Sequence, residues 1–293
     1  MKKLKTINTL LVRAALSLGV IAMLFVTSCQ QSADEPNATD FSATEADAIA
    51  QADFDEIDDI AESALGYADG SIGGKTDGTE ERGMDERASC ATVTHDADAQ
   101  TITIDFGDGC TGPYGNTRSG IIFITYDGKR FIPGSTWKVE LRNFYFNDRH
   151  IEGTRMTENV SESLESNPKF HITLTDGKVT WPDGTFATSE VDRYREWFRA
   201  SNPMLDEMHI LEGSIAFGLN KEGVRYSTTV LADLIFKRIC RASNTARIPV
   251  QGIKEIEIGE KTYTIDFGDG TCDSIITITV GDESREVDVS NRI

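Results

Sequence analysis

The sequence is short of positive charge for its length. It has 29 Lys and Arg residues against 48 Asp and Glu residues, which gives a formal net charge of −19 at pH 7. From Gln30 to Gly70 there is no Lys or Arg at all. A surface this acidic argues against nucleic acid as a partner and against electrostatic docking on anionic lipid.

The sequence also lacks the short motifs by which many enzymes are recognised. It contains no Gly-x-Ser-x-Gly, no His-Glu-x-x-His and no Gly-x-x-x-x-Gly-Lys segment. It has no Cys-x-x-Cys spacing, which disfavours zinc and redox sites, and we expect no cofactor. We therefore favour a protein without catalytic activity. A glycosidase remains the alternative, because its two carboxylates are set by their separation in space and not by sequence spacing.

One short segment occurs twice: residues 103–110 read TIDFGDGC and residues 264–272 read TIDFGDGTC. Its alternating polar and apolar side chains predict a half-buried strand, and its glycines predict a tight turn. Carboxylates near such turns suit calcium, and the candidate ligands are Asp105, Asp108, Asp266, Asp269 and Asp273. We favour the alternative that each Asp hydrogen-bonds its own turn, because no EF-hand loop is present.

The N-terminus has the features of a bacterial export signal. An apolar run from Ala14 to Val26, too short to span a membrane, follows Lys2, Lys3 and Lys5. Val26-Thr27-Ser28-Cys29 resembles the lipobox of bacterial lipoproteins. The resemblance implies cleavage before Cys29 and a lipid on its thiol, so that the membrane is a partner through this anchor. Cleavage would move the formal charge from −19 to −23, because residues 1–28 contain four basic residues and no acid.

The residues after the cysteine bear on location. Gln30 replaces the Asp that retains enteric lipoproteins in the inner membrane, and Asp34 and Glu35 follow. Surface-exported lipoproteins of the Bacteroidota are similar in carrying acids soon after the cysteine. We expect an outer-membrane lipoprotein whose body faces outward, with a periplasm-facing body as the alternative.

Composition divides the chain into a signal peptide at 1–28, an acidic tether at 29–43, an amphipathic acidic helix at 44–66, a flexible linker at 67–87 and an all-β domain with internal repeats at 88–293. Thr44 and Asp47 resemble a capping-box start for the helix. Apolar residues then follow at largely three-and-four spacing: Ile49, Ile57, Ile60, Ala61, Ala64 and Leu65. The helix could dock a partner, but we favour a solvated helix that either rests one apolar stripe on the β domain or does not pack at all.

From Ala88 onward the pattern is that of strands joined by short turns. We predict strands at Ala91–His95, Thr101–Phe106, Ile121–Tyr126, Thr136–Phe146, His150–Val160, Phe170–Leu174, Thr185–Trp197, Met208–Leu219, Val224–Leu234, Val250–Ile258, Lys261–Phe267, Ile275–Val280 and Arg285–Val289. Turn signals include Asp127-Gly128, Asp176-Gly177 and Glu222-Gly223. Strands without crossover helices indicate an antiparallel meander, forming a twisted sandwich or a partly closed barrel.

Two local features refine this pattern. The apolar face changes parity between Leu141 and Phe144, which predicts a β-bulge near Arg142-Asn143. Residues 192–199 also fit helical spacing, so their strand assignment has an alternative.

A second repeat lies inside the first. Residues 150–154 read HIEGT and residues 209–214 read HILEGS. Paired His and Glu side chains could form a metal or acid–base site with His150 and His209, but a Gly in a strand more often marks a bulge or close packing. The mirrored order of the outer and inner repeats indicates one continuous β domain.

Five cysteines are present. Cys29 is assigned to lipid, which leaves Cys90, Cys110, Cys240 and Cys272 in an oxidising compartment. Their matching placement in each half favours Cys90–Cys110 and Cys240–Cys272, although four cysteines allow three pairings.

The repeated motifs carry two resemblances. Together with the lipobox and Ile151-Glu152-Gly153-Thr154, they resemble an uncharacterised lipoprotein family of the Bacteroidota, which implies no activity. The pentapeptide Asp-Phe-Gly-Asp-Gly is locally similar to PKD-type immunoglobulin-like repeats, where Ile104 and Ile265 replace a Trp.

Function is therefore left with two hypotheses from the sequence. The first is a non-catalytic envelope protein that is structural or binds a glycan or an envelope protein. The second is a glycan-processing hydrolase or a calcium-dependent glycan-binding protein. The aromatic candidates for a cleft are Trp137, Trp181, Trp197, Tyr114 and Tyr145, although Trp and Tyr in β proteins are more often core or cross-strand residues.

Overall fold

The computed structural model describes residues 38–70, 86–112, 115–243 and 245–290. A long helix, α1 (Ala38–Ala68), comes first, and the 3₁₀ turn η1 (Glu86–Ala88) precedes the strands. Among the described residues no helix is long and apolar enough to cross a membrane. The strands are β1 (Thr92–Asp96), β2 (Thr101–Asp105), β3 (Cys110–Thr111), β4 (Thr117–Asp127), β5 (Thr136–Phe146), β6 (Arg149–Asn159), β7 (Lys169–Thr180), β8 (Phe186–Phe198), β9 (Glu207–Ile210), β10 (Ile215–Leu219), β11 (Arg225–Lys237), β12 (Gln251–Ile258), β13 (Lys261–Asp269), β14 (Ile275–Val280) and β15 (Glu283–Asp288).

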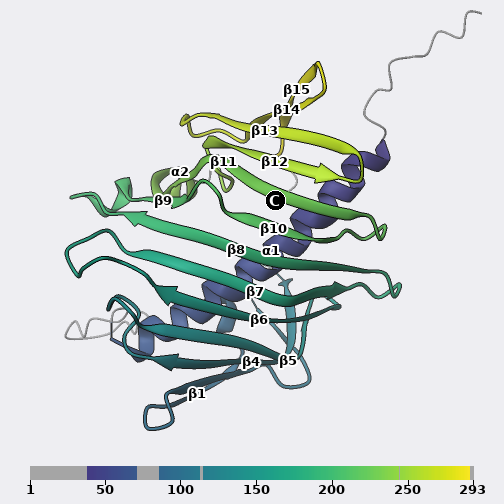
Figure 1. Ribbon diagram of the computed structural model, residues 1–293. Helices are drawn as coiled ribbons and strands as arrows, with labels where there is room; N and C mark the ends of the chain where they lie inside the picture. The colour runs from purple at the N-terminus through teal and green to yellow at the C-terminus, as the bar shows by residue number, and fades with distance from the viewer. Residues whose placement is uncertain (1–37, 71–85, 113–114, 244, 291–293) are drawn as a thin grey trace, which may run out of the picture. The chain divides into compact units, whose positions relative to one another are not determined.

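These strands form one antiparallel sheet of 15 strands. Each strand pairs almost throughout with its neighbour in the chain, in the order β1-β2-β4-β5-β6-β7-β8-β10-β11-β12-β13-β14-β15, with β3 beside β4 (Figure 1). The path is open, since the end strands β1 and β15 pair only with β2 and β14. The predicted all-β meander preceded by one acidic helix is confirmed.

Several predicted boundaries are wrong. The helix begins at Ala38 and not at Thr44, which lies inside it, so the capping-box interpretation fails. The alanine-rich sequence before residue 50 favours helix over the predicted tether. The predicted strand Met208–Leu219 is interrupted, because residues 211–214 leave the ladder at Gly213, whose φ is +82°, before β10 resumes beside β8.

The C-terminal end of β11 was also misjudged. The strand continues to Lys237 and is followed by a short helix, α2 (Arg238–Ala242), which the sequence analysis did not predict. Residues 192–198, by contrast, belong to the strand β8, so their alternative helical spacing is not used.

The predicted bulge at Arg142-Asn143 is confirmed. The register of β5 with β6 shifts between Glu140 and Phe144, and Asn143 has a φ of +51°. Gly120 of β4 lies opposite this bulge with a φ of +81°, and a Cβ there would come within 2.0 Å of the Asn143 carbonyl oxygen. Only glycine fits that close backbone approach.

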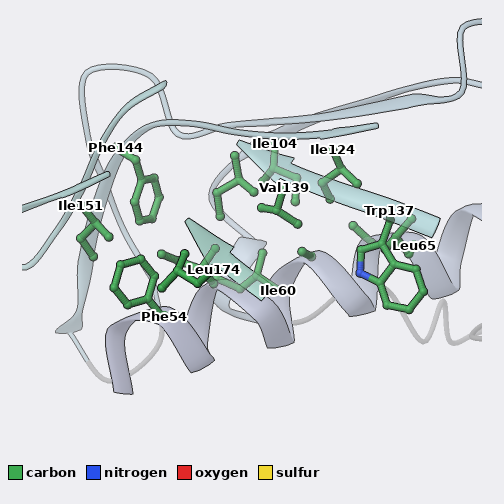
Figure 2. Close-up of a cluster of buried hydrophobic side chains, with 14 of the residues drawn as sticks. Phe54, Ile60, Leu65, Ile104, Ile124, Trp137, Val139, Phe144, Ile151 and Leu174 are labelled. Atoms are coloured by element: carbon green, nitrogen blue, oxygen red, sulfur yellow. The ribbon is translucent and has the colours of Figure 1, made fainter. Parts of the chain in front are cut away.

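The helix α1 packs its apolar stripe on one face of the sheet. Phe54, Ile60 and Leu65 point toward Ile104, Ile124, Trp137, Val139, Phe144, Ile151 and Leu174 (Figure 2). The stripe also includes Ile57, Ala61 and Ala64, all at most 4% exposed. This agrees with the packed form of the sequence interpretation, in which one apolar stripe rests on the β domain. Ile49 of that prediction lies where side chains are not described. We call the covered side of the sheet the helix face and the other side the open face.

A second apolar cluster belongs to the C-terminal strands and contains Val230, Leu234, Ile256, Tyr263, Ile265, Phe267 and Ile276. Disulfides join Cys90 to Cys110 and Cys240 to Cys272, as predicted from their placement in the two halves. In each case the cysteine that follows a repeated turn, Cys110 or Cys272, is bonded to a cysteine 20 or 32 positions earlier in the chain.

Candidate functional site

A groove of about 880 Å³ lies on the open face of the sheet. It runs across β5, β6, β7 and β8. The ionisable side chains that line it are those of Glu140, Arg142, His150, Glu152, Asp176, Lys178 and Glu190. These side chains alternate along their strands with buried residues of the helix face such as Val139, Ile151 and Val179, as the two-residue period of a strand requires.

Irregular backbone forms the floor of this groove. The β5 bulge lies at one end, and the β6–β7 and β7–β8 registers also shift, at Glu152/Thr154 and at Leu174/Gly177. A Cβ on Gly177 would lie 2.3 Å from the Ser189 carbonyl oxygen, so the backbone there admits no side chain. Bulges bend strands and redirect side chains, which explains why a hollow forms in an otherwise regular sheet.

The polar groups of the groove are held by contacts to one another. Glu152 Oε2 lies 3.7 Å from His150 Nδ1 and 3.6 Å from Lys178 Nζ. Glu190 Oε1 accepts a hydrogen bond of 2.9 Å from the backbone N–H of Asp176. These contacts place carboxylate oxygens and cationic N–H groups side by side, an arrangement that can both accept from and donate to a ligand rich in hydroxyl groups.

Aromatic rings stand at the rim. Tyr145 stacks on His150 with ring centroids 4.6 Å apart, and Tyr145 also lines a neighbouring hollow of about 530 Å³ with Ser119, Asp148 and Pro182. Across the groove, Lys178 Nζ lies 5.2 Å from the ring centre of Phe186, which is 44% exposed. The groove therefore has the half-buried Tyr145–His150 stack near one side and the exposed ring of Phe186 near the other.

The inner repeat does not form a paired histidine site. His150 lies in the groove, whereas His209 lies in β9, near Glu207 and Asp233, with its ring against Phe198. The strands β7 and β8 lie between the two. His150 is level with Phe186 of β8, whereas His209 pairs with Glu196, ten positions further along that strand, which corresponds to about 33 Å.

The three tryptophans lie outside the groove. Trp137 is buried in the core under α1, Trp181 packs against that core, and Trp197 contacts Phe131 and donates to Asp206. Of the aromatic candidates only Tyr145 reaches the groove rim, while Tyr114 lies outside the described residues. Cys29 and the lipobox also lie outside them.

The duplicated aspartates act locally. Asp105 Oδ1 accepts from the Gly107 N–H at 2.8 Å, and Asp266 Oδ1 accepts from the Gly268 N–H at 2.9 Å. Asp269 and Asp273 likewise accept from Thr271 and Ile275. No group of three or more His, Cys, Asp or Glu side chains placed to hold a metal ion occurs in the described part of the chain.

The sequence analysis missed the role of the acids on α1. They form ion pairs with arginines of the helix face: Asp53 with Arg149, Glu56 with Arg118, Asp58 with Arg155 and Arg193, and Glu62 with Arg195. Asp59 also pairs with Arg87 of η1 and with Arg241 of α2. The sequence did carry a signal for these pairs: β4, β6 and β8 have Arg residues at positions that face the core. A buried Arg needs an acidic partner, and the acidic helix is the element that could supply one.

Burial changes the titration of this layer. It raises the pKa of Asp58 to about 7 despite the opposing charges of Arg155 and Arg193. Burial also lowers the pKa of Arg155 to about 10, although Asp58 acts in the opposite direction. For Glu62 burial alone would raise the pKa, but the charge and hydrogen bond of Arg195 bring it below the usual 4.5.

Comparison with protein-family models, with curated proteins and with solved structures finds no match for this chain. The resemblance to a lipoprotein family of the Bacteroidota therefore stays a prediction from sequence motifs, and function must be argued from the site itself.

Proposed function

We propose that this protein is a lipid-anchored cell-envelope protein whose β domain binds an extended glycan in the open-face groove, without catalysis. The observation that carries the proposal is the groove at the three bulged ladders, where carboxylates, cations and the Tyr145–His150 stack converge. Sugars offer hydroxyl groups to such polar side chains and an apolar ring face to an aromatic platform.

The size and direction of the groove support an extended ligand. It crosses β5 to β8, which corresponds to about 15 Å at ordinary strand spacing. Contacts from four strands can thus engage several sugar units in succession.

A glycan hydrolase is the second candidate, because the groove holds Glu140, Glu152 and Glu190. Two observations favour binding. Glu152 lies close to His150 and Lys178, and Glu190 accepts from a backbone N–H, so both carboxylates are engaged by the protein. No tryptophan platform lies beside them, since all three tryptophans pack elsewhere.

A glycan array probed with residues 30–293 tests the proposal, together with a hydrolysis assay on every retained glycan. We expect retention of at least one envelope or host glycan with no product formed. Glu152→Gln should abolish retention, whereas Glu158→Gln, an exposed position further along β6, should leave it intact. Product formation that Glu152→Gln abolishes would favour the hydrolase, and no retention at all would contradict both.

A further inference from the structure

The helix face of the sheet is a charged surface built to hold an acidic helix. Arg118 of β4, Arg149 and Arg155 of β6, and Arg193 and Arg195 of β8 all direct their guanidinium groups at α1. Arg118 and Arg155 are 1% and 4% exposed. We call these five residues the arginine row.

The acids on α1 match this row along the helix. The Arg149 guanidinium binds Asp53 with distances of 2.8 and 2.6 Å, and Arg155 Nη2 lies 2.6 Å from Asp58 Oδ2. Arg195 binds Glu62, which lies nine positions after Asp53. The pairs thus occur at successive turns and fix both the direction and the register of the helix.

The sheet does not need α1 to complete its strand ladder. The path from β1 to β15 is made by strands alone, and the described contacts of α1 with it come from apolar side chains and ion pairs. Residues 71–85 join α1 to η1, and a chain of that length can span up to about 50 Å. The same contacts can therefore be made by an identical helix from another molecule.

We propose that the arginine row is an exchangeable helix-binding site, and that the α1 of a second copy of this chain fills it to give a helix-swapped dimer. An identical helix brings the same acids and the same apolar stripe, so every contact between α1 and the sheet is kept when the helices are exchanged. The lipid anchor proposed at Cys29 would also confine copies to one surface, which raises their effective concentration.

The test separates helix and sheet charges into two chains. One variant of residues 30–293 carries Asp53→Lys and Glu62→Lys on α1, and the other carries Arg149→Glu and Arg195→Glu on the sheet. Within either variant the helix and sheet repel, as they also do in its homodimer. Only a swapped heterodimer brings opposite charges together at both sites. We expect each variant to be a monomer by light scattering and their equimolar mixture to give a 1:1 dimer.

Two controls make the outcome decisive. Circular dichroism and thiol counts establish that both variants keep their strands and disulfides. A chain with all four substitutions restores opposite charges between helix and sheet, so on its own it should form the same swapped dimer as the wild type. If the reversed pairs form poorly, the native helix of one variant still matches the native sheet of the other, so a dimer is still expected. A mixture of folded variants that stays monomeric would overturn the proposal.

Discussion

Asp58 of α1 and Arg155 of β6 form an ion pair of 2.6 Å between Oδ2 and Nη2, and their side chains are only 9% and 5% exposed. Arg193 of β8 approaches the same carboxylate oxygen at 3.5 Å. The acidic helix is thus held to the sheet by buried charge as well as by its apolar stripe. In the sequence, the acidity of α1 suggested a solvated helix. In the structure, these acids pair with arginines of the sheet and so help to hold the helix in place.

This pair predicts an unusual dependence of stability on pH. The folded pKa of Asp58 is about 7, raised by burial above the usual 3.8 of the unfolded chain, so the folded state holds a proton that the unfolded state has released. Such a group stabilises the fold fully below the unfolded pKa, and its contribution is lost as pH rises through the folded pKa. Glu62 has the opposite sign, but its loss begins only below its usual 4.5.

We therefore expect the free energy of unfolding to fall by about 2–3 kcal/mol between pH 5 and pH 8. Urea denaturation at several pH values measures this change. In Asp58→Asn the fall should be largely absent. An equal slope in wild type and Asp58→Asn would show that Asp58 does not titrate in this range.

Deleting one partner of a buried pair should cost more than deleting a partner at the surface. Glu56→Ala leaves Arg118, which is 1% exposed, without its carboxylate, and we expect a loss of about 3–5 kcal/mol. Asp59→Ala on the same helix is the matched control, since its partners Arg87 and Arg241 are 23% and 68% exposed, and it should cost at most about 1 kcal/mol. Similar losses for both, measured by urea denaturation, would argue against a buried role for Glu56.

The bulge opposite β4 can be tested with two glycines of similar φ. Gly120→Ala places a Cβ against the Asn143 carbonyl, whereas Gly184→Ala meets nothing within 4 Å at a φ of +83°. Both substitutions strain the backbone by about 1–2 kcal/mol. Gly120→Ala should cost about 1–3 kcal/mol more, because its clash involves backbone that cannot move freely. Thermal unfolding of the two variants decides, and equal melting temperatures would contradict the close approach.

The lipid anchor is tested separately from the β domain. We expect Cys29→Ala to move the protein from the membrane fraction to the soluble fraction once the signal peptide is removed. Protease shaving of intact cells then tests the location. A domain that survives until the outer membrane is permeabilised would face the periplasm and contradict the surface assignment.

Much of the fold follows from local pattern. The two-residue alternation of polar and apolar side chains predicted most strands, and the parity change after Leu141 predicted the bulge in β5. The matching position of the cysteines in the two halves favoured the two disulfides that the structure contains, Cys90–Cys110 and Cys240–Cys272. The apolar stripe of α1 was visible at three-and-four spacing. These features depend on neighbours in sequence or on a repeated motif.

The groove and the arginine row could not be predicted in this way. Asp176-Gly177 was interpreted as a turn, but β7 continues through it, with Asp176 at a φ of +55° in a bulge. That bulge and the one in β5 bring Glu140, Lys178 and Glu190 to one hollow from three different strands. Similarly, Arg149 and Asp53 lie 96 positions apart, and only the register of α1 on the sheet pairs them.

The most direct measurement of the central claim is hydrogen–deuterium exchange of residues 30–293 with and without the glycan that binds most tightly on the array. If the groove is the binding site, amide exchange should slow at the bulges, in 140–143, 152–154 and 176–178. Exchange in α1 from Asp53 to Ala68, on the helix face, should not change. Protection confined to α1 or to the C-terminal strands β12–β15, with the bulges unaffected, would contradict the assignment of the open-face groove.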